Sequence, residues 1–452
     1  MKGLKYITGC SLTLLLLAAC NKEEGPSIDD YFLNYEIPEI PVTEDYQVGI
    51  FYNKNGDLAQ TPNGEPNFTR WELLTKLDSE LSAKTNYNNL TPQIMPESQQ
   101  EGLLEVKGDD QSFRMIPMVQ QHVNGCIEAG ANFMILPELG ADINQGPGTR
   151  LNRSDSLLVT MFLGRSGRGG NKMPHMGQPG RDFIDLKTMK IVVSINWNSI
   201  VDLPPQLSSS NCIEDVAGKE YEGVNYTRQE LLNNFFCEIA KCFFSDEGYY
   251  KVGGNRPMVY IKNKTAEIYA KDSKAMYDSI RRAVKEATGY DIYIVAESAD
   301  VWCNQMRYQY FYMSGGVDAV ASRNMYDQSE VTRSYMYPQM IDQNWKYNRE
   351  TALPAFGDGS MELIPTVGPG WNKLIQDGRG AIGNSPIVKR DPATYRTICN
   401  VAKMNAGRNR LIFIDSYNKY NFDSFIEPTV EGYGNGYGKT YLQITREQFK
   451  KN

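Results

Sequence analysis

Short apolar runs alternate with longer amphipathic segments along most of this chain. One run, Leu411–Ile414, is continuously apolar, which is typical of a strand buried on both faces of a parallel sheet. Seven further runs have the length and composition of strands, and segments with helical spacing separate most of them. The predicted strands are 46–52, 132–136, 190–196, 256–261, 292–296, 317–320, 363–367 and 411–415. Eight parallel strands with crossover helices predict an α/β fold of the (β/α)8 TIM-like barrel type, with long loops on the substrate side.

Acidic residues stand at the ends of two predicted strands. Glu138 follows the strand 132–136, and Glu297 follows the strand 292–296. The carboxyl ends of barrel strands meet at one face, where barrel enzymes carry their catalytic groups. Both glutamates are therefore candidates for catalysis. The alternative for a residue in such a place is a surface cap or a salt bridge.

Amide and aromatic residues follow other predicted strands. The strand 190–196 ends in Asn196-Trp197, and the strand 411–415 continues into Tyr417-Asn418. Amide groups can hydrogen-bond sugar hydroxyls in pairs, and an aromatic ring can pack on the apolar face of a sugar. These residues therefore suggest a glycan ligand. Trp197 could equally belong to the core, and the last segment could be an ordinary strand followed by a surface loop.

The C-terminal segment carries a recognisable pattern: Asn418, then Ile426-Glu427-Pro428, then a glycine-rich run that leads to Tyr441-Leu442. It resembles the C-terminal signature of the endo-α-mannanases of glycoside hydrolase family 99, and that of the related WbsX-type glycan-processing proteins. The resemblance implies a barrel fold and a glycan ligand. The segment 365–371, which reads Pro-x-Val-x-Pro-Gly-Trp, resembles a substrate-side segment of the same family. The predicted substrate-binding residues are Asn196, Trp197, Trp371, Tyr417, Asn418, Tyr420 and Glu427.

Three positions depart from the family signature. The two glutamates that the family uses fall on Lys419 and Phe422 of this chain, and the signature's tryptophan falls on Tyr420. A lysine cannot accept a proton at neutral pH unless burial strongly lowers its pKa, and a phenyl ring transfers none. The family's own acid–base pair is therefore excluded by side-chain type. The remaining acidic candidates are Asp415, Asp423, Glu427, Glu138 and Glu297. Of these we predict Glu138 and Glu297 as a relocated catalytic pair.

The composition limits the kinds of partner. The chain has 452 residues, of which 41% are apolar and 22% charged, and this supplies ample material for one barrel domain over 46–452. A net charge of −7 argues against a nucleic-acid partner. With two histidines, a histidine-rich metal site is nearly excluded, although a calcium site made of carboxylates is not. We expect neither a metal nor a cofactor.

The N-terminus predicts export. Lys2 and Lys5 precede an apolar stretch, Leu12–Leu17, which ends in Leu-Ala-Ala-Cys20. This order is typical of a signal peptide over 1–19, and the last four residues resemble a bacterial lipobox with Cys20 as the acylated residue. An ordinary secretory signal is the alternative. Residues 20–45 lack periodicity and predict a tether. The acidic pair after Cys20 resembles a surface-export signal of some Gram-negative bacteria, so we predict an outer-membrane, cell-surface lipoprotein.

Three functions stay open at this point. The chain could be a diverged glycosidase-like barrel with relocated carboxylates. It could also be an inactive barrel that binds glycans at the cell surface, or a scaffold in an outer-membrane glycan-uptake complex. Fold resemblance cannot separate these functions, because activity depends on the site.

Overall fold

The computed structural model describes residues 35–53, 97–98, 108–141, 151, 153–163, 184–195, 212–262, 269–298, 315–322, 336–372, 387–388, 390–419, 424–431 and 436–451. The predicted signal peptide and Cys20 lie outside these residues.

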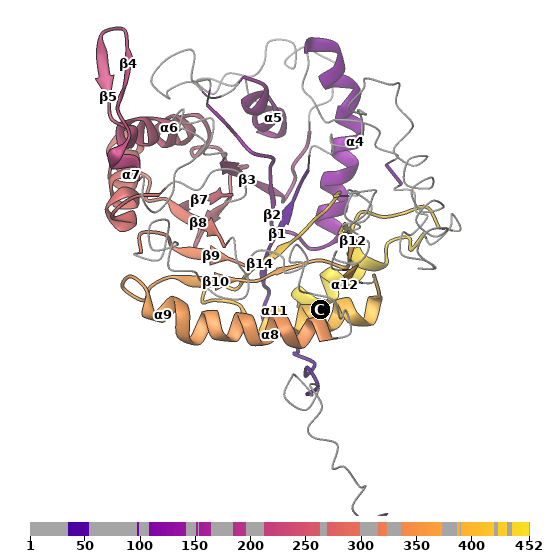
Figure 1. Ribbon diagram of the computed structural model, residues 1–452. Coiled ribbons are helices and arrows are strands. Elements are labelled where there is room, and N and C mark those ends of the chain that lie inside the picture. Colours follow the sequence, from indigo (N-terminus) through magenta and orange to yellow (C-terminus); the bar gives the residue numbers. More distant parts are fainter. Residues whose placement is uncertain are drawn as a thin grey trace, which may run out of the picture. The chain divides into compact units, whose positions relative to one another are not determined.

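The centre of the fold is a nearly closed barrel of parallel strands (Figure 1). Its strands are β1 (Gln47–Phe51), β2 (Phe133–Ile135), β3 (Lys190–Ile195), β7 (Arg256–Ile261), β8 (Tyr293–Glu297), β9 (Ala319–Ala321), β10 (Glu362–Ile364), β11 (Thr366–Val367) and β14 (Leu411–Ile414). They are hydrogen-bonded in the order β10-β9-β8-β7-β3-β2-β1-β14-β11. All eight predicted strand segments are present, and the predicted (β/α)8 fold is confirmed.

A proline explains why nine strands occupy eight barrel positions. Pro365 stands between β10 and β11, and it has no N–H to donate to a ladder. β10 pairs with β9 on one side of the break, and β11 pairs with β14 on the other. The carbonyl oxygen of Pro365 still accepts a hydrogen bond of 2.9 Å from the backbone N–H of Phe413. One interrupted strand therefore links the two ends of the sheet.

Helices cover the outside of the barrel (Figure 1). The main helices are α4 (Gly108–Glu128), α5 (Arg153–Leu163), α6 (Arg228–Phe243), α7 (Ser273–Thr288), α8 (Tyr337–Tyr347), α9 (Leu353–Ala355), α11 (Pro392–Asn405) and α12 (Thr440–Phe449). Thr227 caps α6, where its side-chain oxygen accepts from the N–H of Glu230 at 3.2 Å. Gly289 ends α7 with a left-handed φ of 80°. Figure 1 shows α6 beside α7, and α8 beside α11.

Shorter elements are attached to this frame. A π-helix, Asn348–Ala352, joins α8 to α9, and a 3-10 turn covers Ile213–Asp215. β4 (Lys219–Tyr221) and β5 (Val224–Tyr226) form a hairpin. β6 (Lys251–Val252) pairs antiparallel with β7, and β12 (Trp371–Asn372) pairs antiparallel with β13 (Ile387–Val388).

The last residues of the predicted tether are attached to the barrel domain. The N–H of Ile40 donates to Asn400 Oδ1 at 3.0 Å, and Lys403 Nζ donates to the Ile40 carbonyl at 2.5 Å. Arg410 donates to the Glu44 carbonyl at 2.6 Å. Among the described residues, no helix is both long enough and apolar enough to cross a membrane.

Aromatic rings fill the interior of the barrel, and a glycine makes room for them. Phe133 stacks on Tyr250 with ring centroids 4.0 Å apart, and Phe413 lies edge-on to Phe133 at 6.1 Å. Gly49 of β1 lies between these rings. A Cβ there would come within 2.3 Å of the Phe133 ring and 3.0 Å of the Phe413 ring, and both rings are fully buried. The packing therefore requires glycine at position 49.

We predict that Gly49→Ala destabilises the protein by at least about 2 kcal/mol, because the added methyl group overpacks the barrel interior. Thermal unfolding measures the effect. Gly223→Ala is the control: nothing lies within 4 Å of its added Cβ, so only the φ of 80° opposes the alanine. An unchanged melting temperature in Gly49→Ala would contradict this packing.

Candidate functional site

The carboxyl ends of four barrel strands bring charged residues to one face. Glu297 ends β8, Asp415 follows β14 directly, and Lys262 follows β7 directly. Glu138 lies three residues past β2, and the next residue, Leu139, continues the pairing with Ile195 of β3. Because these strands run parallel in one barrel, their carboxyl ends bring the charges to its mouth.

Lys262 is the centre of this group. Its Nζ lies 2.5 Å from Oε1 of Glu138, and the two side chains are 40% and 23% exposed. Burial alone would lower the pKa of Lys262, but the charges of Glu138, Glu297 and Asp415 and the hydrogen bond to Glu138 outweigh it. The net effect raises the pKa of Lys262, so its ammonium group stays charged at neutral pH. Three acidic side chains from three different strands therefore act on one cation.

A second lysine occupies the same face. Lys419 Nζ lies 3.7 Å from Asp415 Oδ2 and 5.0 Å from the centre of the Trp371 ring. Its side chain is 24% exposed, whereas Trp371 is only 1% exposed. In this arrangement the ammonium group lies over the indole, so a sugar would reach the Trp371 ring only after Lys419 moves.

Asn418 holds two parts of the chain together. Its Oδ1 accepts from the backbone N–H of Asn53 at 2.9 Å, and its Nδ2 donates to the Asn53 carbonyl at 3.1 Å. The residue is fully buried. The two hydrogen bonds therefore connect the segment after β14 to the end of β1. This gives Asn418 a structural role in addition to the predicted role in binding.

Glu427 belongs to a buried polar group. His122 Nδ1 is 2.8 Å from the Tyr52 hydroxyl, and His122 Nε2 is 3.3 Å from Glu427 Oε1. Ser98 donates a hydrogen bond to the same carboxylate oxygen. Burial and the charge of Glu427 raise the pKa of the Cys126 thiol well above its ordinary value. Glu427 is 1% exposed, so these contacts are made inside the protein.

Tyr417 also points into the protein. It is 1% exposed, and its ring lies 5.2 Å from the ring of His122. A Cβ on Gly125 of α4 would come within 2.3 Å of its hydroxyl oxygen. Tyr417 therefore packs closely on α4, where it contributes to the core.

The structure places the predicted residues in three groups. Glu138 and Glu297 lie at the mouth, together with Asp415. Trp371, Tyr417, Asn418 and Glu427 are buried side chains. Asn196, Trp197, Tyr420 and Phe422 lie outside the described residues, so the register that assigns the second family glutamate to Phe422 stays a prediction.

Sequence reasoning missed Lys262. The available signal was its position directly after a six-residue strand, the same criterion that identified Glu297. A search restricted to acidic residues at strand ends does not find Lys262. Among the residues described, no cluster of three or more histidine, cysteine or acidic side chains is arranged to hold a metal ion.

Solved structures resemble this chain in fold. A protein described as a glycoside hydrolase-like protein matches with a TM-score of 0.63 and 22% identity, over 94% of this chain and 99% of that chain. A GH99 endo-alpha-mannosidase from Bacteroides thetaiotaomicron, in complex with BIS-TRIS-propane, gives a TM-score of 0.46 and 14% identity, over 90% and 97% of the two chains. No protein-family model and no curated protein matches. The first likeness shows a glycoside hydrolase-like barrel fold.

We predict that Asn418→Asp destabilises the protein by roughly 1–3 kcal/mol, because the carboxylate cannot donate to the Asn53 carbonyl and is itself buried. Thermal unfolding measures this effect. The matched control is Asn124→Asp on the exposed face of α4. Asn124 accepts at Oδ1 from Gln120 at 3.3 Å and from Lys187 at 3.0 Å, and an aspartate keeps both acceptor bonds. Equal stability of the two variants would rule out the structural role of Asn418.

Proposed function

We propose that this chain binds glycans at the mouth of its barrel, as a diverged relative of glycoside hydrolase family 99 and the WbsX-type proteins. The observation that carries the proposal is the convergence of Glu138, Glu297 and Asp415 on Lys262. Carboxylates and ammonium groups that meet at a barrel mouth are suited to hydrogen-bond sugar hydroxyls. The glycoside hydrolase-like fold supports this choice of ligand.

Hydrolysis at this mouth would require two carboxyl groups on either side of the scissile bond. Glu138 accepts a close contact from a cation, so it suits the role of base or nucleophile and not that of proton donor. Glu297 is 9% exposed at the end of β8 and is the second carboxyl group at the mouth; as a carboxylate, it would have to take up a proton from water before it acts as the general acid. In the proposed reaction, Glu297 protonates the leaving oxygen while Glu138 acts on the sugar carbon directly or through water.

Glycan capture without hydrolysis is the second candidate, and the Lys262–Glu138 contact favours it. A carboxylate that is held by an ammonium group at 2.5 Å is hindered from attacking a substrate unless Lys262 moves. Lys419 stands where the family signature has a glutamate, which removes one of the family's own proton-transfer groups. In glycan capture, the charged residues would hold a sugar in place and no glycosidic bond would be broken.

A glycan screen separates the two functions. Binding is measured by calorimetry and hydrolysis by released reducing ends, on α-mannans and on mixed host and plant glycans. If the barrel is a hydrolase, Glu138→Gln and Glu297→Gln each lower the rate of release at least about 100-fold, because each removes a group that moves a proton or attacks carbon. If it captures glycans, Glu138→Gln changes the affinity for the glycan and no reducing ends are released.

Lys346→Met, on the exposed face of α8, is the control. A folded protein that neither binds nor cleaves any of these glycans would contradict the proposal.

We also propose that the chain is a lipoprotein anchored through Cys20 on the outer face of the outer membrane, within a glycan-uptake complex. Support comes from the signal-peptide pattern, the lipobox-like residues and the acidic pair after Cys20. The barrel would then meet its glycan outside the cell.

Metabolic labelling with a fatty acid tests the anchor. The wild-type chain is expected to take up label and fractionate with membranes, whereas Cys20→Ser loses the label because the thiol is the acylated group. Cys126→Ser, at a buried thiol, is the control for a cysteine change. Label retained in Cys20→Ser would refute the anchor. Removal of the protein by protease added to intact cells would support its surface exposure.

A further inference from the structure

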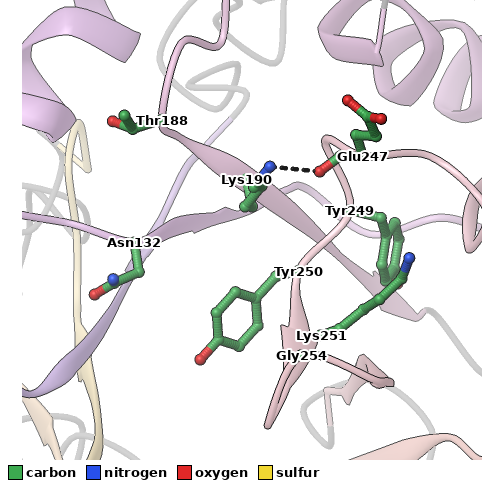
Figure 2. A pocket seen from close by; sticks show the side chains of 8 residues that line it. All are labelled: Asn132, Thr188, Lys190, Glu247, Tyr249, Tyr250, Lys251 and Gly254. Atoms are coloured by element: carbon green, nitrogen blue, oxygen red, sulfur yellow. Dashed lines mark hydrogen bonds between the residues drawn. The ribbon is translucent and has the colours of Figure 1, made fainter.

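A cavity lies at the end of the barrel opposite the mouth. It has a volume of about 510 Å³ and lies at the amino ends of β2 and β3, against the segment that leads into β6 (Figure 2). Lys190 begins β3, whereas Ile195 ends it at the mouth. Six residues of extended chain separate the two faces by roughly 16 Å. The cavity is therefore distinct from the candidate site at the mouth.

Two lysines give this cavity a positive lining. Lys190 Nζ donates to the backbone carbonyl of Glu247 at 2.6 Å, and Lys251 Nζ lies 5.4 Å from the centre of the Tyr290 ring. Within the described part of the chain, neither ammonium group forms an ion pair with a carboxylate. Figure 2 shows the Glu247 carboxylate directed away from Lys190 while its carbonyl faces that lysine. In a chain with a net charge of −7, these ammonium groups have no carboxylate counter-ion among the residues that the structure describes.

The lining also includes neutral polar groups, beside the acidic residue Glu247. Asn132 Oδ1 accepts from the N–H of Val48 at 2.9 Å and from Lys450 Nζ at 2.8 Å. Its oxygen is thus already used, and its NH₂ group is the end that can donate to a ligand. The Thr188 hydroxyl lies on the same wall (Figure 2). Tyr250 lies across the cavity from it, and burial raises the pKa of the Tyr250 phenol, which therefore stays neutral.

We propose that this cavity is a second ligand site, selective for a hydroxylated carboxylate of the acidic-sugar class, such as a uronate unit. The two ammonium groups match the carboxylate, and the amide and hydroxyl groups match the ring hydroxyls. A cavity of about 510 Å³ is in the range of small-ligand sites, and it holds a mono- or disaccharide. This site stands apart from the glycan proposal for the mouth, and either can fail without the other.

Calorimetric titration of the protein with glucuronate tests the site, with glucose and acetate as the matched neutral and non-hydroxylated probes. We expect glucuronate to bind at least about tenfold more tightly than either probe, because only glucuronate satisfies both the ammonium groups and the hydroxyl partners. Added salt is expected to weaken the binding of glucuronate.

Charge removal locates the bound ligand. Lys251→Met and Lys190→Met are each expected to weaken glucuronate binding at least about tenfold, whereas Lys346→Met leaves it unchanged. Lys251→Glu serves as a second variant, since it inverts the charge without touching the Lys190–Glu247 hydrogen bond. Circular dichroism confirms that each variant is folded. Absence of glucuronate binding, equal binding of acetate, or binding that survives both Lys→Met changes would each overturn the proposal.

Discussion

The arrangement of the barrel mouth depends on the attraction between the ammonium group of Lys262 and three acidic side chains. Its ammonium group is partly removed from water, which costs free energy, and three acidic side chains from the carboxyl ends of three other strands compensate for that cost. None of the three acids is close to Lys262 in the sequence. Only the parallel closure of the barrel brings them together, so the position of this cation depends on the fold as a whole.

The C-terminal signature separates into residues that hold the fold and residues that face the mouth. Asn418 fastens the segment after β14 to β1, and Glu427 joins a buried group with His122. Lys419 lies among the residues at the mouth, beside Asp415. Loss of a buried hydrogen-bonding partner costs stability, whereas a change at the mouth alters chemistry and leaves the frame intact. This difference explains how the buried residues of the segment can keep their structural role whatever residue stands at position 419.

The sequence predicted the barrel well because its signal is local. Each strand is a short apolar run, and each carboxyl end follows directly from the strand, so Glu138 and Glu297 could be placed at the mouth. The direction of individual side chains was harder to predict. Tyr417 and Asn418 follow the last strand closely, yet both are buried, because α4 and the end of β1 pack over them. Trp371 is covered by Lys419, a contact between segments 48 residues apart in sequence. The role of Lys262 required the positions of three other strands.

The most direct test of the account is an NMR titration of the Lys262 side chain, assigned with Lys262→Arg, in the wild type and in Glu138→Gln. We predict a pKa of Lys262 above 10.5 in the wild type, because the charges of the acids outweigh the effect of burial. In Glu138→Gln the pKa of Lys262 should be lower, because one of these charges is removed. A wild-type pKa below 10.5 that Glu138→Gln leaves unchanged would contradict this prediction. Burial alone would then govern Lys262, and the carboxylates would not converge at the mouth.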